Sequence, residues 1–317
     1  MEKWEKNSSC ELLSGSFPNI SEVQNLRWIN LVNLLLNNFL SYTAIMLNVV
    51  AIHAIRKTSS LANTLKTLLL NLAITDVGVG LIVQPLYTLL LIKWFQQNSE
   101  DCNFRYAFVM ISSTFTLASF LGVVVVSVDR FLAIHLHLRY QELVTHKRVV
   151  AVVISIWFFS VMFSVVFLWL LPDMYSRLLT FPGTFGLVLT TLIYSRIYLT
   201  ARRHKNQIQV LQVRDGGERN DMASFASLVK FAVGAFYVYL VFLICYLPML
   251  ISLVATEMNG PSIPLKGWFV FSVTLFYLGS SLNPVIYCWK MRPIRHAMID
   301  ILPRNMPCLR NRAHHLT

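Results

Sequence analysis

Residues 104–136 read FRYAFVMISSTFTLASFLGVVVVSVDRFLAIHL, and they decide the kind of fold. A helix needs about 20 mostly apolar residues to span a bilayer, and the uncharged middle of this stretch is longer than that. Ser112, Thr116 and Ser119 recur along it at the spacing that places side chains on one face of a helix. The stretch therefore predicts a membrane helix with one polar face turned toward neighbouring helices.

The rest of the chain repeats this pattern. Further apolar runs occupy residues 28–55, 65–92, 149–171, 178–200, 228–255 and 268–289, and Phe181-Pro182-Gly183 with Gly186 interrupts the fifth of the seven near its outer end. Of the 317 residues, 56% are hydrophobic and only 13% are charged, against about a quarter in soluble proteins. We predict an all-α fold, a seven-transmembrane helix bundle over residues 28–290.

Basic residues in the short connecting segments set the orientation. With the N-terminus outside, 20 Lys and Arg residues lie on the cytosolic side and 7 outside, which is the usual bias of membrane proteins. We therefore predict a multi-pass plasma-membrane protein whose residues 1–27 are extracellular, with Asn7 and Asn19 in the N-glycosylation acceptor pattern. The net charge of +12 follows from this topology, and without an aromatic-basic array it predicts no nucleic-acid partner.

Residues 291–317 are predicted to hold a short amphipathic eighth helix and a cytoplasmic tail. Apolar residues repeat at helical spacing at Ile294, Ala297, Met298, Ile301 and Leu302, with basic residues between them. Such a helix lies on the membrane face, so membrane lipids are predicted partners. Cys308 follows closely, and the sequence leaves open whether it carries a palmitoyl chain or stays unmodified.

Asp76 lies deep in the second apolar run, where an acid costs about 2.5 to 3.5 kcal/mol. It needs polar partners, and the candidates on other helices are Asn48, Ser119, Ser280 and Asn283. We predict that these residues converge on a hydrated interior pocket. The alternative is a protonated Asp76 that makes ordinary hydrogen bonds between helices.

Two further features predict a bundle that can change shape. Asp129 and Arg130 stand at the cytosolic end of the third run, where the acid can hold the arginine until another partner competes for it. The alternative is an arginine that simply extends toward the membrane border. Pro248 and Pro284 each remove a backbone donor inside a predicted span, and kinked helices are natural places for a bundle to bend.

Short motifs on separate helices add to this picture. They are Asn48, Leu72-Ala73 with Asp76, Asp129-Arg130-Phe131, Trp157, Tyr194, Cys245-Tyr-Leu-Pro248 and Asn283-Pro-Val-Ile-Tyr287. In this order they resemble the helix-by-helix signature of rhodopsin-like G-protein-coupled receptors. Residues 129–149 and 193–198 are similar to the branch that contains adenosine, melanocortin, cannabinoid and lysophospholipid receptors. The resemblance implies a receptor that passes an extracellular ligand signal to a heterotrimeric G protein.

The resemblance also implies roles for particular residues. Coupling and activation would involve Asp129, Arg130, Phe131, Tyr194, Tyr246, Pro248, Asn283, Pro284 and Tyr287. An allosteric sodium ion would be held by Asp76, Ser119, Ser280 and Asn283. We expect no other metal and no cofactor.

The chain departs from the family pattern at both ends of the bundle. The outer loop over residues 172–177 has no cysteine for the family's usual disulfide, so Cys102 either pairs with Cys10 or stays free. At the cytosolic end, no acid stands near Leu228 to tether Arg130 to the sixth helix. This departure motivates the hypothesis of raised basal signalling.

A ligand pocket is expected in the outer half of the bundle. Its lining would be Leu86, Tyr87, Ser112, Ser113, Thr116, Tyr246, Met249, Leu250, Leu253, Val273 and Tyr277. This set has hydroxyls but no acid, which disfavours a charged amine, and Tyr277 stands where bound retinal would need a lysine. We predict a small neutral or lipophilic extracellular ligand, although an apolar lining also fits plain helix packing.

Other functions are weighed against the receptor. A chemosensory receptor of the same class is one alternative. A seven-helix transporter or channel would be expected to show internal repeats or several charged residues along a pathway, and neither is evident. The sequence also has no pair of acids, nucleophile with a base, or HExxH pattern, so we expect no enzyme activity.

Overall fold

The computed structural model describes residues 17–18, 20–96, 102–136, 139–170, 175–211 and 219–301, and these contain helices and no strand. The elements are α2 (Ile20–Val23), η1 (Gln24–Leu26), α3 (Arg27–Lys57), α4 (Asn63–Gly78), η2 (Val79–Val83), α5 (Gln84–Phe95), α6 (Cys102–Leu136), α7 (Tyr140–Leu143), α8 (His146–Leu170), α9 (Tyr175–Leu211), α10 (Arg219–Asn259), α11 (Ile263–Lys290) and α12 (Arg292–Ile301). Asn7, Cys10, Asn19, Leu302 and Cys308, which carry sequence predictions, lie outside the described residues.

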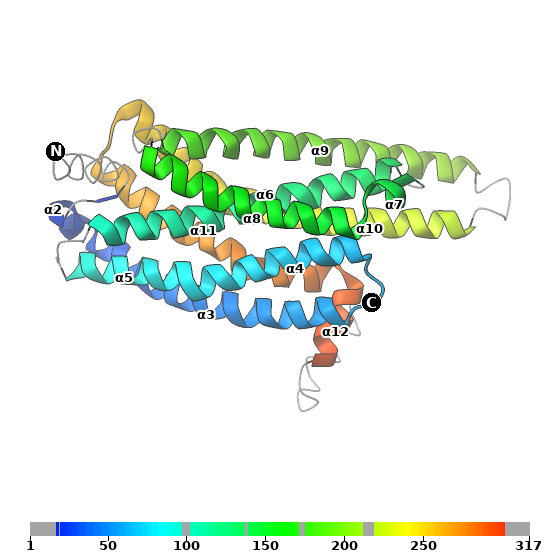
Figure 1. Ribbon diagram of the computed structural model, residues 1–317, viewed down its shortest axis with the longest axis horizontal. Helices are drawn as coiled ribbons and strands as arrows, with labels where there is room; N and C mark the ends of the chain where they lie inside the picture. The colour runs from blue at the N-terminus through cyan, green and yellow to red at the C-terminus, as the bar shows by residue number, and fades with distance from the viewer. Residues whose placement is uncertain are drawn as a thin grey trace.

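The long helices lie side by side, roughly along one axis, with α2 and α7 at opposite ends of the bundle (Figure 1). In the described part of the chain, six stretches are long and apolar enough to cross a membrane: Gln24–Lys57, Asn63–Phe95, Cys102–Leu136, His146–Val166, Leu228–Asn259 and Ile263–Lys290. They coincide with six of the seven predicted spans. The remaining predicted span, 178–200, falls inside α9.

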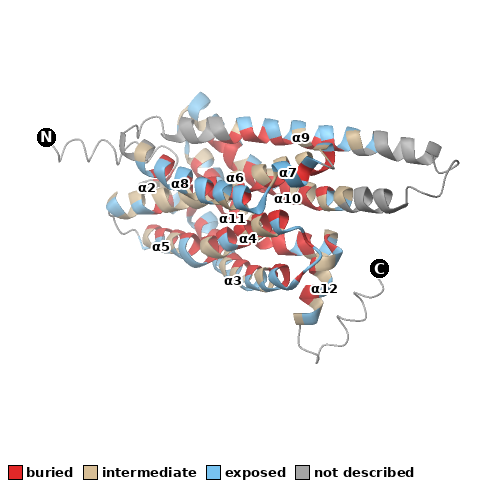
Figure 2. Cartoon of the chain, turned by 45° about the vertical axis from the view of Figure 1, so that its right-hand side comes forward, coloured by how far each residue is buried: buried red, intermediate tan, exposed pale blue. Residues whose placement is uncertain are grey.

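Burial follows the pattern expected of a bundle in lipid. Exposed residues lie on the outer faces of the helices, and buried residues lie between them (Figure 2). Many of the exposed side chains are large and apolar, among them Trp28, Phe39, Phe158 and Phe185. A surface of this kind is stable against hydrocarbon rather than against water.

The second span is one continuous helical rod with a local change of pitch. Between α4 and α5 the backbone forms a π-helix over Val79–Val83, immediately before Pro85. The proline ring cannot donate a backbone hydrogen bond and would collide with the carbonyl four residues earlier, and a wider turn relieves that conflict.

The fifth span differs from the sequence expectation. α9 runs without a break from Tyr175 to Leu211, so Pro182 does not interrupt it and the prediction of a break was wrong. The glycines serve close packing instead. Gly183 lies against the Tyr246 hydroxyl, and a Cβ at Gly186 would collide with the Phe120 ring. These contacts hold α9 against α10 and α6.

α12 turns away from the bundle axis (Figure 1). Three of the apolar residues that the sequence places on its membrane face, Ile294, Ala297 and Met298, are buried within the protein. α12 contacts α3 and α11, so this face rests on the bundle rather than on open lipid. Contact of α12 with the cytosolic leaflet stays a prediction.

α3 carries a polar face that sequence reasoning missed. Asn30, Asn33 and Asn37 are fully buried at helical spacing in its N-terminal half. The Asn37 amide donates to the Gln84 carbonyl at 2.9 Å and to the Thr88 hydroxyl at 2.8 Å. The amides of Asn30 and Asn33 have no hydrogen-bond partner among the described residues. Buried amides are costly without partners, so this seam is a place for ordered water.

Candidate functional site

The residues predicted around Asp76 meet in one small cavity at the centre of the bundle. Asp76, Ser119, Ser280 and Asn283 all line it, although they come from α4, α6 and α11. The Asn283 amide donates to the Asp76 carboxylate at 2.8 Å. The cavity has a volume of about 10 Å³, enough for one water-sized occupant.

Asn48 supports this cavity from outside. Its amide donates to the backbone carbonyl of Ser280 at 2.9 Å and to that of Ala44 at 2.8 Å. It therefore fixes α11 against α3 rather than contacting the Asp76 carboxylate. The predicted convergence of polar residues on one pocket is correct for Ser119, Ser280 and Asn283, while Asn48 acts through the backbone.

An aromatic layer separates the cavity from the half of the bundle that holds α2. Phe242 and Phe276 line the cavity, and the Tyr246 ring packs on them at centroid distances of 5.6 Å and 6.1 Å. Phe120 closes the layer from α6, 5.7 Å from Phe242. Tyr246 lies two residues before Pro248, so a change in the kink of α10 would move this layer.

The half of the bundle that holds α2 contains a pair of tyrosines among apolar side chains. The hydroxyls of Ser112 and Tyr277 are 3.2 Å apart, and Tyr87 donates to the Val270 carbonyl at 2.8 Å. The Tyr87 and Tyr277 rings contact each other edge to face, with centroids 5.7 Å apart. The predicted apolar neighbours on α10 and α11 are also buried: Met249, Leu250, Leu253 and Val273.

The predicted pocket residues on α5 and α6 do not all belong to this set. Ser113 was placed in the lining, but its hydroxyl donates to Ser164 on α8 at 3.1 Å, because it lies one position around the helix from Ser112. A place for Ser113 in the ligand pocket stays a prediction. Leu86 and Thr116 are only half-buried.

An aromatic cap closes the α2 end of the bundle beside these tyrosines. Phe17 is buried, with its ring 5.2 Å from Phe269, 5.8 Å from Trp94 and 6.4 Å from Phe108. Nearby, the Lys266 ammonium lies 2.8 Å from the Glu22 carboxylate and ties the segment after Phe17 to α11. The described residues before α3 therefore cover this end of the bundle.

Cys102, at the first position of α6, is disulfide-bonded. Its sequence-predicted partner, Cys10, lies outside the described residues. Cys245 and Cys288 are free thiols.

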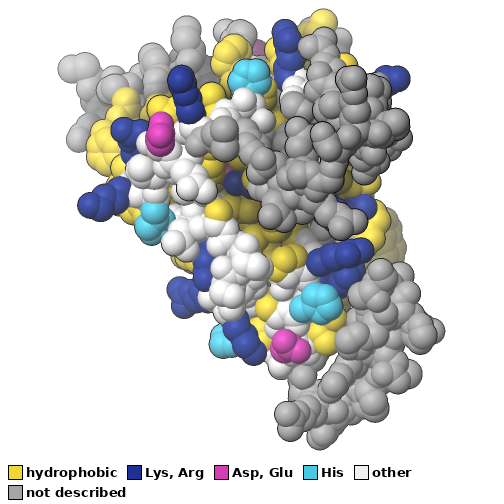
Figure 3. Space-filling view, turned by 90° about the vertical axis from the view of Figure 1, so that its right-hand side faces the viewer, with side chains coloured by type: hydrophobic (Ala, Val, Ile, Leu, Met, Phe, Trp, Pro, Cys, Tyr) yellow, Lys and Arg dark blue, Asp and Glu magenta, His cyan; other side chains and the backbone are white. Residues whose placement is uncertain are grey.

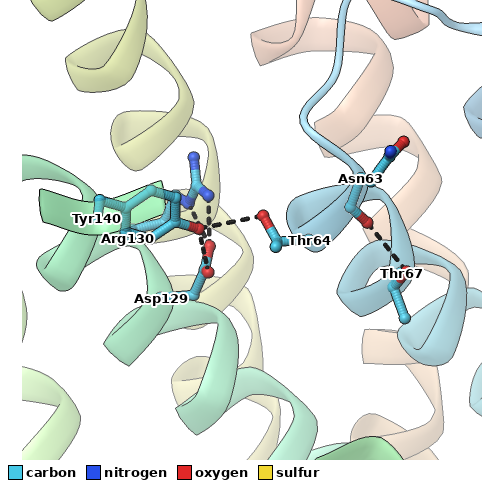
Figure 4. A network of polar contacts seen from close by, with 6 residues as sticks. All are labelled: Asn63, Thr64, Thr67, Asp129, Arg130 and Tyr140. Atoms are coloured by element: carbon cyan, nitrogen blue, oxygen red, sulfur yellow. Dashed lines mark hydrogen bonds and ion pairs between the residues drawn. The ribbon is translucent and has the colours of Figure 1, made fainter. Parts of the chain in front are cut away.

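The opposite end of α6 carries a charged network (Figure 4). The Arg130 guanidinium forms an ion pair with the Asp129 carboxylate, with its Nε 3.0 Å from Oδ2. The Tyr140 hydroxyl donates to the other oxygen, Oδ1, at 2.6 Å. The Tyr140 proton is engaged in that bond, so the Tyr140 oxygen acts as the acceptor for the Thr64 hydroxyl, 3.1 Å away. Asp129 thus restrains Arg130. Tyr140 of α7 bonds to Asp129, and Thr64 of α4 bonds to Tyr140.

Tyr140 keeps its proton under physiological conditions. Burial, together with the negative charge of Asp129, raises the pKa of Tyr140 to about 12. The phenol therefore remains a hydrogen-bond donor to the carboxylate at every pH a cell maintains.

Three other predicted activation residues, Phe131, Tyr194 and Tyr287, make no hydrogen bond to Arg130 among the described contacts. Tyr194 accepts a hydrogen bond from Ser127 at 3.1 Å and packs on Phe236, with centroids 5.2 Å apart. The buried Tyr287 hydroxyl has no hydrogen-bond partner among the described residues. Phe131 stacks on His135, one turn further along α6. In this structure, no described hydrogen bond joins either tyrosine to Arg130.

This end of the molecule is basic. Figure 3 looks at it directly and shows Lys and Arg side chains spread across it, with few acids among them. Exposed cations from the connecting segments include Arg56, Lys57, Arg139, Lys147 and Arg148. Such a surface suits an acidic partner or an anionic membrane face.

Comparison with known proteins gives this arrangement a family. A family model described as 7 transmembrane receptor (rhodopsin family) matches residues 47–175 and 170–287. The chain belongs to this family. It is therefore a seven-helix receptor that signals to G proteins, and not an enzyme, as the sequence predicts.

Relatives of this rhodopsin-family receptor fall in the predicted branch and beyond it. Adenosine receptor A2b of Gallus gallus is 24% identical over 296 residues, covering 81% of this chain and 84% of that protein. Cannabinoid receptor 1 of Taricha granulosa is 23% identical over 264 residues, covering 75% and 54% respectively. Trace amine-associated receptor 5 of Mus musculus is 26% identical over 270 residues, covering 75% of each.

Several residues of this receptor's site were missed from the sequence. Phe276 stands four residues before Ser280 and seven before Asn283, so helical spacing could have placed it at the cavity. Tyr140 follows Asp129 in a connecting segment with no periodic pattern. Phe17 precedes the first helix, and nothing in the local sequence signals that it is buried.

Proposed function

We propose that this receptor recognises a small neutral or lipophilic ligand between the Ser112–Tyr277 hydroxyl pair and the aromatic layer around Tyr246. The hydroxyl pair is the observation that carries the proposal. It offers hydrogen bonds without charge, and its predicted apolar neighbours on α10 and α11 are buried. A ligand with one polar group and an apolar body satisfies such a site.

The proposal places the N-terminus outside the cell and the Asp129–Arg130 network in the cytosol. Two observations support this orientation. The network end is rich in exposed Lys and Arg, as cytosolic faces are (Figure 3). The disulfide of Cys102 lies at the other end of α6, and disulfides form in the oxidising exterior. Cys10 is the partner we propose for it.

A sodium ion at Asp76 belongs to the same proposal. The cavity residues supply the oxygens that a hard cation prefers: one carboxylate from Asp76, two hydroxyls from Ser119 and Ser280, and the Asn283 amide. The cavity admits one occupant of about the size of a water molecule. A bound cation would offset the cost of a buried carboxylate.

Guanine-nucleotide exchange in membranes that carry the chain, with a panel of G proteins and no ligand, tests the coupling end. We expect nucleotide exchange above that of empty membranes. Asp129 pairs with Arg130, but no acid stands near Leu228 to give Arg130 a second restraint. Arg130→Ala should abolish it. Lys147→Ala removes an exposed cation of the same end and should leave at least half of the exchange.

The native chain and its variants are compared at equal amounts of receptor in the membrane. Exchange that persists in Arg130→Ala would contradict the role of Arg130. Background exchange from the native chain would contradict the hypothesis of raised basal signalling.

A panel of compounds taken from the names of the relatives, namely adenosine, a cannabinoid lipid and a trace amine, tests the proposed ligand site. We expect adenosine or a cannabinoid lipid to change exchange more than a trace amine, because Ser112 offers an ammonium group no carboxylate. Ser112→Ala with Tyr277→Phe should weaken the response about tenfold or more, since both hydroxyls are removed. A response to amines alone would contradict the neutral site.

A further inference from the structure

A lipid-facing groove opens between α9 and α10, separate from the Asp76 cavity and from the Ser112–Tyr277 pair. Its volume is about 560 Å³, within the size range of small-molecule pockets. Its walls come from Thr191, Tyr194, Ser195, Ile197, Tyr198 and Leu199 of α9 and from Val229, Ala232, Val233, Phe236 and Tyr239 of α10. The lining is mostly apolar, so the groove suits a hydrocarbon occupant.

The groove has a closed end and an open end. Near the middle of the bundle, the hydroxyls of Thr191 and Tyr239 are 2.7 Å apart and join the two helices. Beyond this contact, the wall residues Tyr198, Leu199 and Val233 are exposed. Ala232 is buried and forms the floor of the groove. The groove therefore runs from mid-membrane toward the end of the bundle that holds Arg130.

Positive charge stands at the open end. Arg202 follows Leu199 by one turn on the groove face of α9, and Lys230 is adjacent to the groove residue Val229 on α10, about a quarter turn around that helix; both side chains are exposed. Among the described side chains of α9 and α10, the only acid is Glu257, near the opposite end of α10. Among the described side chains, therefore, no acid at this end of the two helices lies beside the two cations, so the opening attracts an anionic group.

We propose that this groove binds an anionic phospholipid. One acyl chain lies between α9 and α10 against Ala232 and Phe236, and the phosphate headgroup meets Arg202 and Lys230. The match of an apolar trough with a cationic rim carries the proposal, since it fits the two parts of one lipid molecule. A sterol would use the trough without needing the rim.

The site can be tested without reference to signalling or orientation. The full chain is placed in nanodiscs of one symmetric composition, with a photoactivatable phosphatidylserine whose diazirine is on an acyl chain, and labelled peptides are mapped. A phosphatidylcholine with the same chain serves as the neutral probe. We expect phosphatidylserine to label the groove walls at least threefold more strongly.

Matched variants locate the site. Val233→Trp and Ser195→Phe fill the groove from opposite walls, and each should lower groove labelling severalfold. Ile154→Trp, on a lipid-facing position of α8 outside the groove, should not. Arg202→Gln with Lys230→Gln should reduce phosphatidylserine labelling to the phosphatidylcholine level. The same change at Lys147 and Arg148, exposed cations elsewhere on this end, should leave it unchanged.

Three results would overturn the proposal. Equal labelling by the two probes would mean that the rim does not select charge. Labelling unaffected by both filling variants would place the lipid elsewhere. Displacement of the label by cholesterol at every phosphatidylserine content would identify a sterol groove instead. Each result would leave G-protein coupling untouched, because no G protein takes part in the measurement.

Discussion

Replacing Asp129 by Asn is expected to raise ligand-free nucleotide exchange by about tenfold. The carboxylate pairs with Arg130 inside the protein, and an amide of the same shape keeps the packing but loses the charge. A hydrogen bond to a charged group is worth about 1.5 to 3 kcal/mol, and each 1.4 kcal/mol changes a population tenfold. The freed arginine becomes available to a G protein.

Two neighbouring variants make this expectation specific. Glu142→Gln removes an exposed acid of α7 and should leave basal exchange unchanged. Tyr140→Phe removes one hydrogen bond to the Asp129 carboxylate, so its increase should be smaller than that of Asp129→Asn. Tyr140 would act independently of the acid if its variant raised exchange more, and the proposed hold on Arg130 would be wrong if Asp129→Asn left exchange unchanged.

Much of the fold follows from composition and periodicity. The predicted spans end within a few residues of the observed helices for the first four and the seventh, because runs of apolar residues reveal how much chain lies in lipid. The fifth and sixth helices are the exceptions. α9 continues to Leu211 and α10 begins at Arg219, both in polar sequence beyond the predicted ends of 200 and 228. Hydropathy cannot detect a helix that leaves the membrane.

The polar site around Asp76 could be predicted because the free-energy cost of a buried acid and the helical spacing of its partners lead to the same residues. An acid within lipid demands partners, and Ser280 with Asn283 lies on one face of a helix, so their meeting with Asp76 follows from physics. Contacts made by connecting segments obey no such rule. Tyr140 reaches Asp129, and Phe17 reaches Phe269, through chain geometry that only the folded structure reveals.

The different partners of Ser112 and Ser113 could not be predicted from the sequence. Ser112 and Ser113 are adjacent, so on a helix they point about a quarter turn apart. Ser112 meets Tyr277 in the interior, whereas Ser113 meets Ser164 at the contact with α8. Polarity alone identifies both as inward-facing, but only the packing of α8 separates ligand contact from helix contact.

Sodium should stabilise the receptor, and Asp76→Asn should remove that effect. An ion that binds the folded state adds about 1.4 kcal/mol to the free energy of unfolding at ten times its dissociation constant. In the native chain we therefore expect the Tm in nanodiscs to rise as sodium replaces N-methylglucamine at constant ionic strength. The amide of Asp76→Asn lacks the charge that would hold the ion in its cavity, so its Tm should stay flat.

The slope against sodium, rather than the absolute Tm, carries this prediction. Asp76→Asn also removes a buried charge, and that change alone shifts stability by its own amount. Ser119→Ala removes one cavity hydroxyl and should shift the rise to higher sodium, whereas Thr190→Ala removes a buried hydroxyl from α9 outside the cavity and should not. If the native Tm did not respond to sodium, or if Asp76→Asn kept the full response, the cavity would be a water site. Its polar residues would then serve only to join α4, α6 and α11 around a buried acid.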